Sequence, residues 1–147
     1  MADTVKTQLM QSLAAALSAI PEIRTVERRH PVGYDLDRGD LPVLFLYEKN
    51  ETGRRANRLR LGSIHVEMAT WVKLLPQSKD PGYQAFYDQA DAIAGEVWAL
   101  IQRQPGILIA QEDLRRPAIG NDNLGELILQ YRITYGHAVG DAFTTQV

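Results

Sequence analysis

The chain contains no cysteine among its 147 residues, which excludes disulfide bonds and thiolate metal sites. It also has no apolar run near the roughly 20 residues that a membrane-spanning helix needs. The first residues lack the cationic start and apolar block of a signal peptide. A formal net charge of −2 offers no overall attraction to nucleic acid. We therefore expect a soluble cytosolic protein that binds neither membrane nor specific nucleic acid.

The usual signatures of catalysis are missing as well. No serine lies in a Gly-x-Ser-x-Gly turn, and no glycine-rich segment followed by lysine leads from a strand into a helix. We expect no enzymatic activity, no cofactor and no metal. The alternative is a small metal- or histidine-dependent enzyme that uses His65, Glu67 and Arg132, with His137 as a second metal ligand. A catalytic zinc site usually needs three converging protein ligands. Such polar residues on a sheet more often form solvated cross-strand pairs.

Length and composition indicate one globular domain. A chain of 147 residues fits one core, and its 45% hydrophobic and 23% charged residues are ordinary for a folded domain. We expect a single domain over residues 1–147, with its core between about residues 4 and 137. The segment from residue 138 to 147 shows no apolar periodicity, and we expect a mobile tail there.

Two segments show apolar residues at helical spacing. The first follows a cap at Asp3 or Thr4 and ends at Pro21. The second follows Asp80, with Pro81 at its first position, and ends at Pro105. The apolar stripes consist of Val5, Leu9, Leu13, Ala16, Leu17 and Ile20 in the first helix, and of Ala85, Phe86, Ala90, Ile93, Ala94, Val97, Trp98 and Ile101 in the second.

Five further segments have the composition of strands. A phase slip in the longest one predicts a β-bulge at Gly62–Ser63. The last one alternates cleanly, with Leu127, Leu129, Tyr131, Ile133 and Tyr135 on one face. The stretch from Pro31 to Asp40 has the composition of a loop. The expected strands span Glu22–Arg29 (a weakly buried edge), Pro42–Tyr47, Leu59–Val72, Ile107–Glu112 and Glu126–His137.

This pattern predicts an α+β fold with the element order α-β-β-β-α-β-β. The two helices pack on one face of a mostly antiparallel sheet. The other face carries polar side chains, namely His65, Glu67, Arg132 and Thr134.

A long charged hairpin is the most distinctive feature of the sequence. Glu48–Arg58 separates two strand patterns and contains four cations, two acids and nothing apolar enough to bury. We expect this loop to be mobile in the free protomer and to become ordered against a partner. The candidate partner interface consists of Lys49, Arg54, Arg55 and Arg58, because arginine can pair bidentately with carboxylates. The alternative is a solvated loop, and nucleic acid is disfavoured because no aromatic residue is interleaved.

The whole pattern resembles a known family. The order of an amphipathic helix, a Pro-Val-Leu-Phe-Leu strand, a charged hairpin, a long strand ending at Trp71-Val72, a helix and a final Gly125–Tyr135 strand is similar to the tail-terminator (tail-completion) proteins of long-tailed bacteriophages. The resemblance covers most of residues 4–137.

The resemblance implies a structural virion protein that forms a hexameric ring on the tail tube, stops its growth and joins it to the head connector. The implied partners are other copies of the chain, the tail tube protein and the head–tail connector protein. The implied location is the virion tail, assembled in the bacterial host cytoplasm. Another head–tail joining protein or a minor tail protein is the alternative within the same class. No individual residue role is carried over, because no invariant motif is matched.

Overall fold

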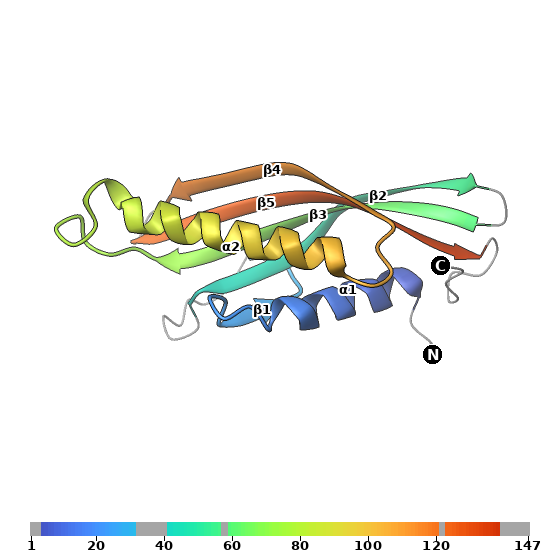
Figure 1. Ribbon diagram of the computed structural model, residues 1–147, viewed down its shortest axis with the longest axis horizontal. Coiled ribbons are helices and arrows are strands. Elements are labelled where there is room, and N and C mark those ends of the chain that lie inside the picture. Colours follow the sequence, from blue (N-terminus) through green and yellow to red (C-terminus); the bar gives the residue numbers. More distant parts are fainter. Residues whose placement is uncertain (1–3, 32–40, 57–58, 121–122, 139–147) are drawn as a thin grey trace.

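The computed structural model describes residues 4–31, 41–56, 59–120 and 123–138, with the side chains of residues 52–60, 137 and 138 left undescribed. It confirms the α+β class and the predicted element order (Figure 1). Arg58, most of the Pro31–Asp40 loop and the tail beyond Ala138 lie outside the described residues. The elements are α1 (Val5–Leu17), β1 (Thr25–Glu27), β2 (Val43–Ala56), β3 (Leu59–Lys73), the 3-10 turn η2 (Pro81–Tyr83), α2 (Gln84–Arg103), β4 (Ile109–Ile119) and β5 (Leu124–Ala138).

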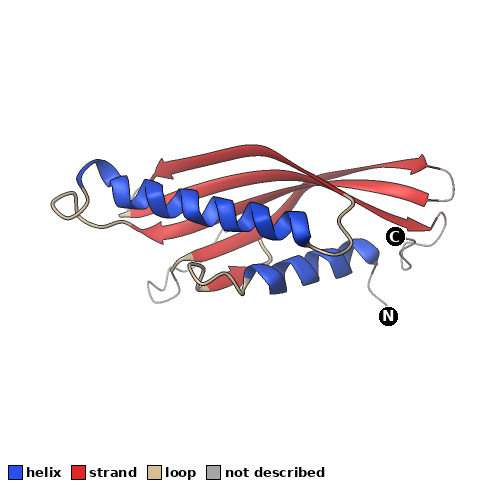
Figure 2. Ribbon diagram, in the orientation of Figure 1, coloured by secondary structure: helices blue, strands red, loops and turns tan. Residues whose placement is uncertain are grey.

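The five strands form one sheet in the order β1-β2-β3-β5-β4. Only β1 and β2 are parallel, and the other neighbours are antiparallel. Both helices lie along one face of this sheet, as predicted (Figure 2). We call this face the inner face and the opposite one the outer face. The first strand is shorter than expected, because only Thr25–Glu27 pairs with Val43–Phe45.

The core lies between the helices and the inner face. The alternation predicted for β5 is confirmed, since all five of its expected inward residues are buried. They pack with the buried stripes of both helices and with every second residue of β3. The inward residues of α1 are Leu9, Met10, Leu13 and Leu17, and those of α2 are Phe86, Ala90, Ile93, Ala94, Val97 and Ile101.

Both predicted helix caps are present, with shifted boundaries. The Thr4 hydroxyl accepts a hydrogen bond from the amide of Thr7 at 3.1 Å, and α1 ends at Leu17, before Pro21. The buried Asp80 carboxylate accepts from the amide of Ala85 at 2.7 Å. The α-helix nevertheless begins at Gln84 rather than at Pro81, because left-handed backbone at Gly82 and Tyr83 interrupts the first turn.

The predicted β-bulge at Gly62–Ser63 is wrong. β3 pairs with β5 without a register shift from Leu59 to Lys73, and the irregularity against β2 lies between Glu48 and Asn50. Gly62 itself occupies an inner-face position, where the ring of Tyr135 fills the space that a Cβ would need. The phase slip in the sequence therefore arises because Gly62 takes the inner-face position in the apolar series, whereas Leu61 lies on the outer face.

The expected charged loop is wrong for Glu48–Ala56. These residues belong to β2 and pair with β3 from Glu48 opposite Val66 to Ala56 opposite Leu59. Apolar alternation cannot reveal such a strand, because its sequence is polar at positions of both parities. The same reason explains β4, which runs to Ile119 although the sequence predicts a strand only to Glu112.

The outer face is divided into two regions. The register places the predicted polar residues together, with His65 opposite Arg132 and Glu67 opposite Gln130. The other end of the same face is apolar, which the sequence did not indicate. Its buried residues are Val43, Phe45, Ala69 and Ile128, with Leu41, Tyr47, Trp71 and Leu114 packed around them.

Candidate functional site

The most prominent feature of the structure is an arm built from the ends of three strands. β4 accompanies β5 only as far as the pair Ile109–Thr134, whereas β2, β3 and β5 continue for several residues. We call residues 52–56, 59–63 and 134–138 the arm. It projects beyond the ends of both helices (Figure 1). Beyond Tyr135, which is buried in the core at the base of the arm, the three strands therefore continue without a helical layer.

The base of the arm is tied to α1 by charged side chains. The Lys6 ammonium lies 3.3 Å from Glu48 and 3.0 Å from Glu51. The Tyr135 hydroxyl donates to the same Glu51 carboxylate at 2.5 Å. The hydrogen bond to Glu51 raises the pKa of Lys6 above its ordinary value, and the nearby Glu48 charge adds to this effect. These contacts join the start of α1 to β2 at the base of the arm.

The structure distributes the predicted interface residues over two places. Arg54 pairs with Leu61 and Arg55 with Arg60 in the ladder, so both belong to the arm. Lys49 lies at the β2 irregularity, five residues before Arg54, which corresponds to roughly 16 Å along a strand. Its ammonium lies 3.6 Å from Glu67 on the outer face. Arginines therefore concentrate in the arm, while Lys49 belongs to a polar cluster at its base.

That polar cluster surrounds Glu67, whose side chain is only 13% exposed. The hydroxyl of Tyr47 donates to one carboxylate oxygen of Glu67, and Gln130 Nε2 donates to the other at 2.6 Å. A neighbouring cavity of about 180 Å³ is lined by Lys49, Asn50, His65, Val66, Asp113, Gln130 and Tyr131. The Glu67 carboxylate already has donors at both oxygens, so its lone pairs are largely used within the protein.

Register separates the two histidines of the alternative metal site. His65 pairs with Arg132, whereas His137 pairs with Arg60 at the far end of the arm. Five strand positions lie between them, or roughly 16 Å, which is far beyond the span of two ligands on one zinc ion. The described residues contain no group of three or more His, Asp or Glu side chains suited to a metal ion. The metal-site interpretation based on His65 and His137 is therefore wrong.

A carboxyl pair joins the segment after α1 to α2. A hydrogen bond between Glu22 and Glu96 raises the pKa of Glu96, and desolvation acts in the same direction. One oxygen of each side chain is buried without another hydrogen-bond partner in the described structure. The pair is adjacent to a cavity of about 310 Å³ lined by α1, α2 and the turn at Pro21. Sequence analysis missed this contact, because the two residues are 74 positions apart.

Sequence analysis also missed the exposed apolar residues along β4. Ile109 is 63% exposed, while Leu108 and Ile119 are each 38% exposed. Their strand is the last in the sheet order. The signal was present as isoleucine at both ends of a charged segment, but only the register shows that this segment is an edge strand. Within the described residues, no helix is long and apolar enough to cross a membrane.

Comparisons with known proteins add little to this geometry. No protein-family model matches the sequence, and no curated protein matches it. A chain from a solved structure described as the virion of a native gene transfer agent particle aligns over 91% of this chain and 92% of its own length. The aligned residues are 12% identical, and the TM-score is 0.48. Similarity at this level gives no information about function.

Proposed function

We propose that this chain is a structural protein of a phage-like virion, of the tail-terminator type. It forms a ring on the end of the tail tube and joins the tube to the head connector. The observation that carries this proposal is the arm, a three-stranded projection that extends beyond the ends of both helices (Figure 1). The α+β class and the element order are those that the resemblance to tail terminators implies.

The chemistry of the arm supports a role in protein contact. Arg54, Arg55 and Arg60 occupy neighbouring ladder positions, and arginine forks suit carboxylates on a partner surface. A β-ladder fixes the backbone of these residues, which lowers the entropy cost of binding relative to a flexible loop. The Lys6 contacts join α1 to β2 next to the arm.

The partners follow from this assignment. Copies of the chain contact one another head-to-tail, and such contacts close into a ring when the rotation between subunits allows it. The ring is a homohexamer, and the arm contacts the tail tube protein, while the opposite end of the molecule contacts the head–tail connector protein. The protein then resides in the virion tail after assembly in the host cytoplasm. It acts without catalysis or a cofactor.

Another head–tail joining or minor tail protein would use the same arm with a different partner. The two functions differ in what the purified protein does to growing tubes. A tail terminator binds tube ends and limits tube length, whereas a minor tail protein leaves the length unchanged.

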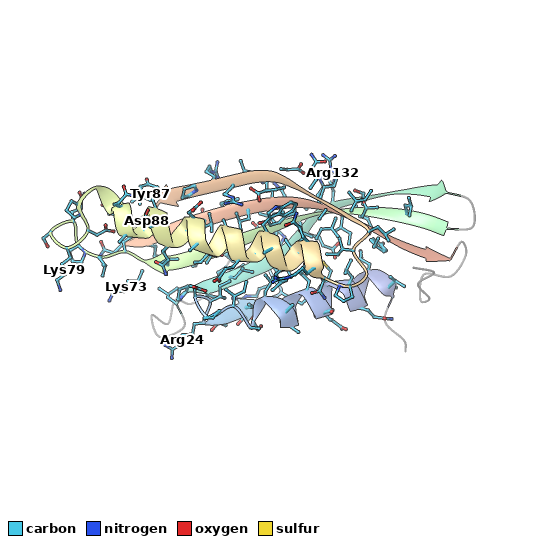
Figure 3. The ribbon with its side chains drawn as sticks, viewed as in Figure 1. Arg24, Lys73, Lys79, Tyr87, Asp88 and Arg132 are labelled. Atoms are coloured by element: carbon cyan, nitrogen blue, oxygen red, sulfur yellow. The ribbon has the colours of Figure 1, made fainter. Side chains whose placement is uncertain are left out.

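A charge reversal in the arm tests the proposal. We expect the double variant Arg54→Glu/Arg55→Glu to change the free energy of unfolding by less than about 0.5 kcal/mol, because neither arginine belongs to the apolar pattern of the core and substitutions outside the core usually have small effects. The same variant should fail to cap tail tubes, measured as uncontrolled tube length in electron micrographs, and should fail to complement a phage that lacks the gene. The matched control for tube capping is Lys73→Glu/Lys79→Glu, which reverses two exposed lysines at the opposite end of the molecule (Figure 3). It is compared in the capping assay alone, because that end is proposed to contact the connector and not the tube.

The possible results separate three conclusions. Normal capping by the arm variant would show that the tube contact lies elsewhere. Equal loss of capping in both variants would show a general charge effect. A wild-type protein that neither forms a ring, by size-exclusion chromatography with light scattering, nor limits tube length would overturn the proposed function.

A further inference from the structure

Opposite the short edge strand β1, the second edge of the sheet is formed by β4. It is the terminal strand in the sheet order, and no described strand lies on its far side. Natural edge strands are commonly protected by charges, proline or bulges, and β4 has Pro117 and a register shift between Glu112 and Leu114. Yet Ile109 at its start is 63% exposed and Ile119 at its end is 38% exposed. Exposed isoleucines at both ends are unusual for an edge strand that is protected against pairing and has no partner.

The sequence of β4 is complementary to itself when read in the opposite direction. Ile109–Ile119 reads IAQEDLRRPAI, with two acids before the central leucine and two bases after it. In an antiparallel pair of identical strands, the acidic half of one copy faces the basic half of the other. Opposite charges directly across an antiparallel pair stabilise it, and like charges destabilise it. The strand therefore favours a second copy of itself as its partner.

The register with β5 fixes which face each β4 side chain occupies. Glu112 is opposite Tyr131 and Arg115 is opposite Leu129, and both partners face the helices. Both charged residues are thus on the inner face despite the bulge between them. Gln111 and Arg116 are opposite Arg132 and Ile128, which places them on the outer face with Ile109 and Ala118. Only a pairing that keeps each face with itself can continue the sheet.

We propose that two copies of this chain pair through β4 about a two-fold axis between Asp113 and Leu114. In this register, Glu112 lies opposite Arg115 of the second copy on the inner face, and Gln111 lies opposite Arg116. Ile109 lies opposite Ala118 on the outer face. One residue beyond the strand, Leu108 meets Ile119 of the second copy, which covers two apolar side chains that are each 38% exposed.

The bulge is compatible with this arrangement because the axis passes through it. A bulged strand loses register against a straight partner, but two bulges placed opposite each other keep the register on both sides. Pro117 faces Ala110 and lacks an amide hydrogen, so the ladder loses one hydrogen bond on each side of the axis.

The charged groups at the axis are already positioned. Arg115 donates to both carboxylate oxygens of Glu112 in its own chain, at 2.9 and 3.0 Å, and lies 3.5 Å from Asp91. Pairing brings a second Glu112–Arg115 unit beside the first, which forms an alternating group of four charges. Because the guanidinium is held before association, less side-chain entropy is lost when the strands meet.

This dimer is independent of the proposed ring. A two-fold contact uses the same patch on both copies and closes at two subunits, whereas a ring needs a head-to-tail contact on other surfaces. The β4 dimer therefore forms either between two unassembled chains or between two rings joined back to back.

Two single charge reversals and their mixture test the pairing. In Glu112→Arg, an arginine lies opposite Arg115 of a second copy, and in Arg115→Glu, a glutamate lies opposite Glu112. We expect each variant alone to dimerise roughly tenfold or more weakly than the wild-type chain, because two attractive pairs become repulsive. An equal mixture should form a heterodimer, since both cross-strand pairs are then attractive again. Native mass spectrometry separates the two homodimers from the heterodimer by mass.

The mixture distinguishes contacts between chains from contacts within one chain, because the ion pair within each variant stays broken. Arg24→Glu is the matched control, since Arg24 is an exposed arginine far from β4 and should leave dimerisation unchanged (Figure 3). If either charge variant fails to fold by circular dichroism, Ile109→Lys at the most exposed apolar position replaces it and should also weaken the dimer. A wild-type chain without a dimer at any soluble concentration, or a mixture with no preference for the heterodimer, would overturn the proposal.

Discussion

The indole ring of Trp98 on α2 stacks parallel on the ring of Tyr131 on β5, with centroids 5.7 Å apart and planes inclined by 4°. This contact joins the second helix to the middle of the sheet. Offset-stacked aromatic pairs contribute about 0.5–1.5 kcal/mol beyond the burial of their area. The pair therefore couples the position of α2 to that of β5, the strand that also forms part of the arm.

Truncation of this contact should destabilise the domain. We expect Trp98→Ala to lower the free energy of unfolding by about 3 kcal/mol, because both the stacking and the packing against the core are lost. Trp98→Phe keeps an aromatic ring and should recover more than half of that loss. Chemical denaturation followed by circular dichroism measures both. Wild-type stability in Trp98→Ala would show that the indole contributes to a partner contact instead of the fold.

For two tyrosines on the same face of β5, loss of the hydroxyl should change the free energy of unfolding differently. Burial raises the pKa of Tyr131, and its hydroxyl oxygen has no hydrogen-bond partner in the described structure. Tyr131→Phe should be neutral or slightly stabilising, because an unsatisfied buried polar group is removed. Tyr135→Phe should cost about 1 kcal/mol, because its hydroxyl donates to Glu51. Equal effects of the two substitutions in thermal denaturation would argue against this difference.

Gly62 should not tolerate a side chain. A Cβ at this position would overlap the ring of Tyr135, so we expect Gly62→Ala to cost about 1–3 kcal/mol through overpacking. Gly95→Ala is the matched control, because a Cβ there meets no other atom and the residue lies on α2. Alanine in a helix interior should raise the stability by about 0.5–1 kcal/mol. Destabilisation by both variants would point to a general effect of glycine replacement.

The Glu22–Glu96 pair should make stability depend on pH. The hydrogen bond with Glu22 raises the pKa of Glu96 in the folded state, so the folded chain binds this proton more tightly than the unfolded chain. Its contribution is fully present below the ordinary glutamate pKa and is lost as the pH rises through the folded value. We expect Glu96→Gln to raise the melting temperature at pH 7 relative to wild type, and to give little or no gain at pH 4.

Glu126→Gln is a control for this measurement, because Glu126 accepts a hydrogen bond from Trp71 and has no carboxyl partner among the described contacts. It should not raise the melting temperature at pH 7. A Glu96→Gln effect of equal size at both pH values would show that the two carboxyls do not share a proton.

Local sequence signals were sufficient for the elements that touch the core. The alternation from Leu127 to Tyr135 was read correctly, because burial selects one side of that strand. Most of both helix stripes was read correctly too, but Ala85 is exposed and the buried Met10 was not expected. The caps at Thr4 and Asp80 were found for a similar reason, since a capping side chain serves amides only a few residues away.

The candidate interface was only partly predictable. The cluster of arginines near Arg54 and Arg55 is visible in the sequence itself and needs no structure to be recognised. That they lie in a paired strand, that Lys49 lies apart beside Glu67, and that His65 is remote from His137 depend on register. Register is set by contacts between residues far apart in the chain, which a local pattern does not contain.

The sequence alone therefore determined the α+β class, the order of its elements and the residues of the helix-facing core, because burial acts on neighbouring side chains with a fixed period. The tertiary structure decided the rest. It placed β4 at the edge with its self-complementary charges exposed, joined Glu22 to Glu96 and extended three strands into the arm. These features depend on strand pairing or on residues distant in sequence, so only the folded backbone brings their groups together.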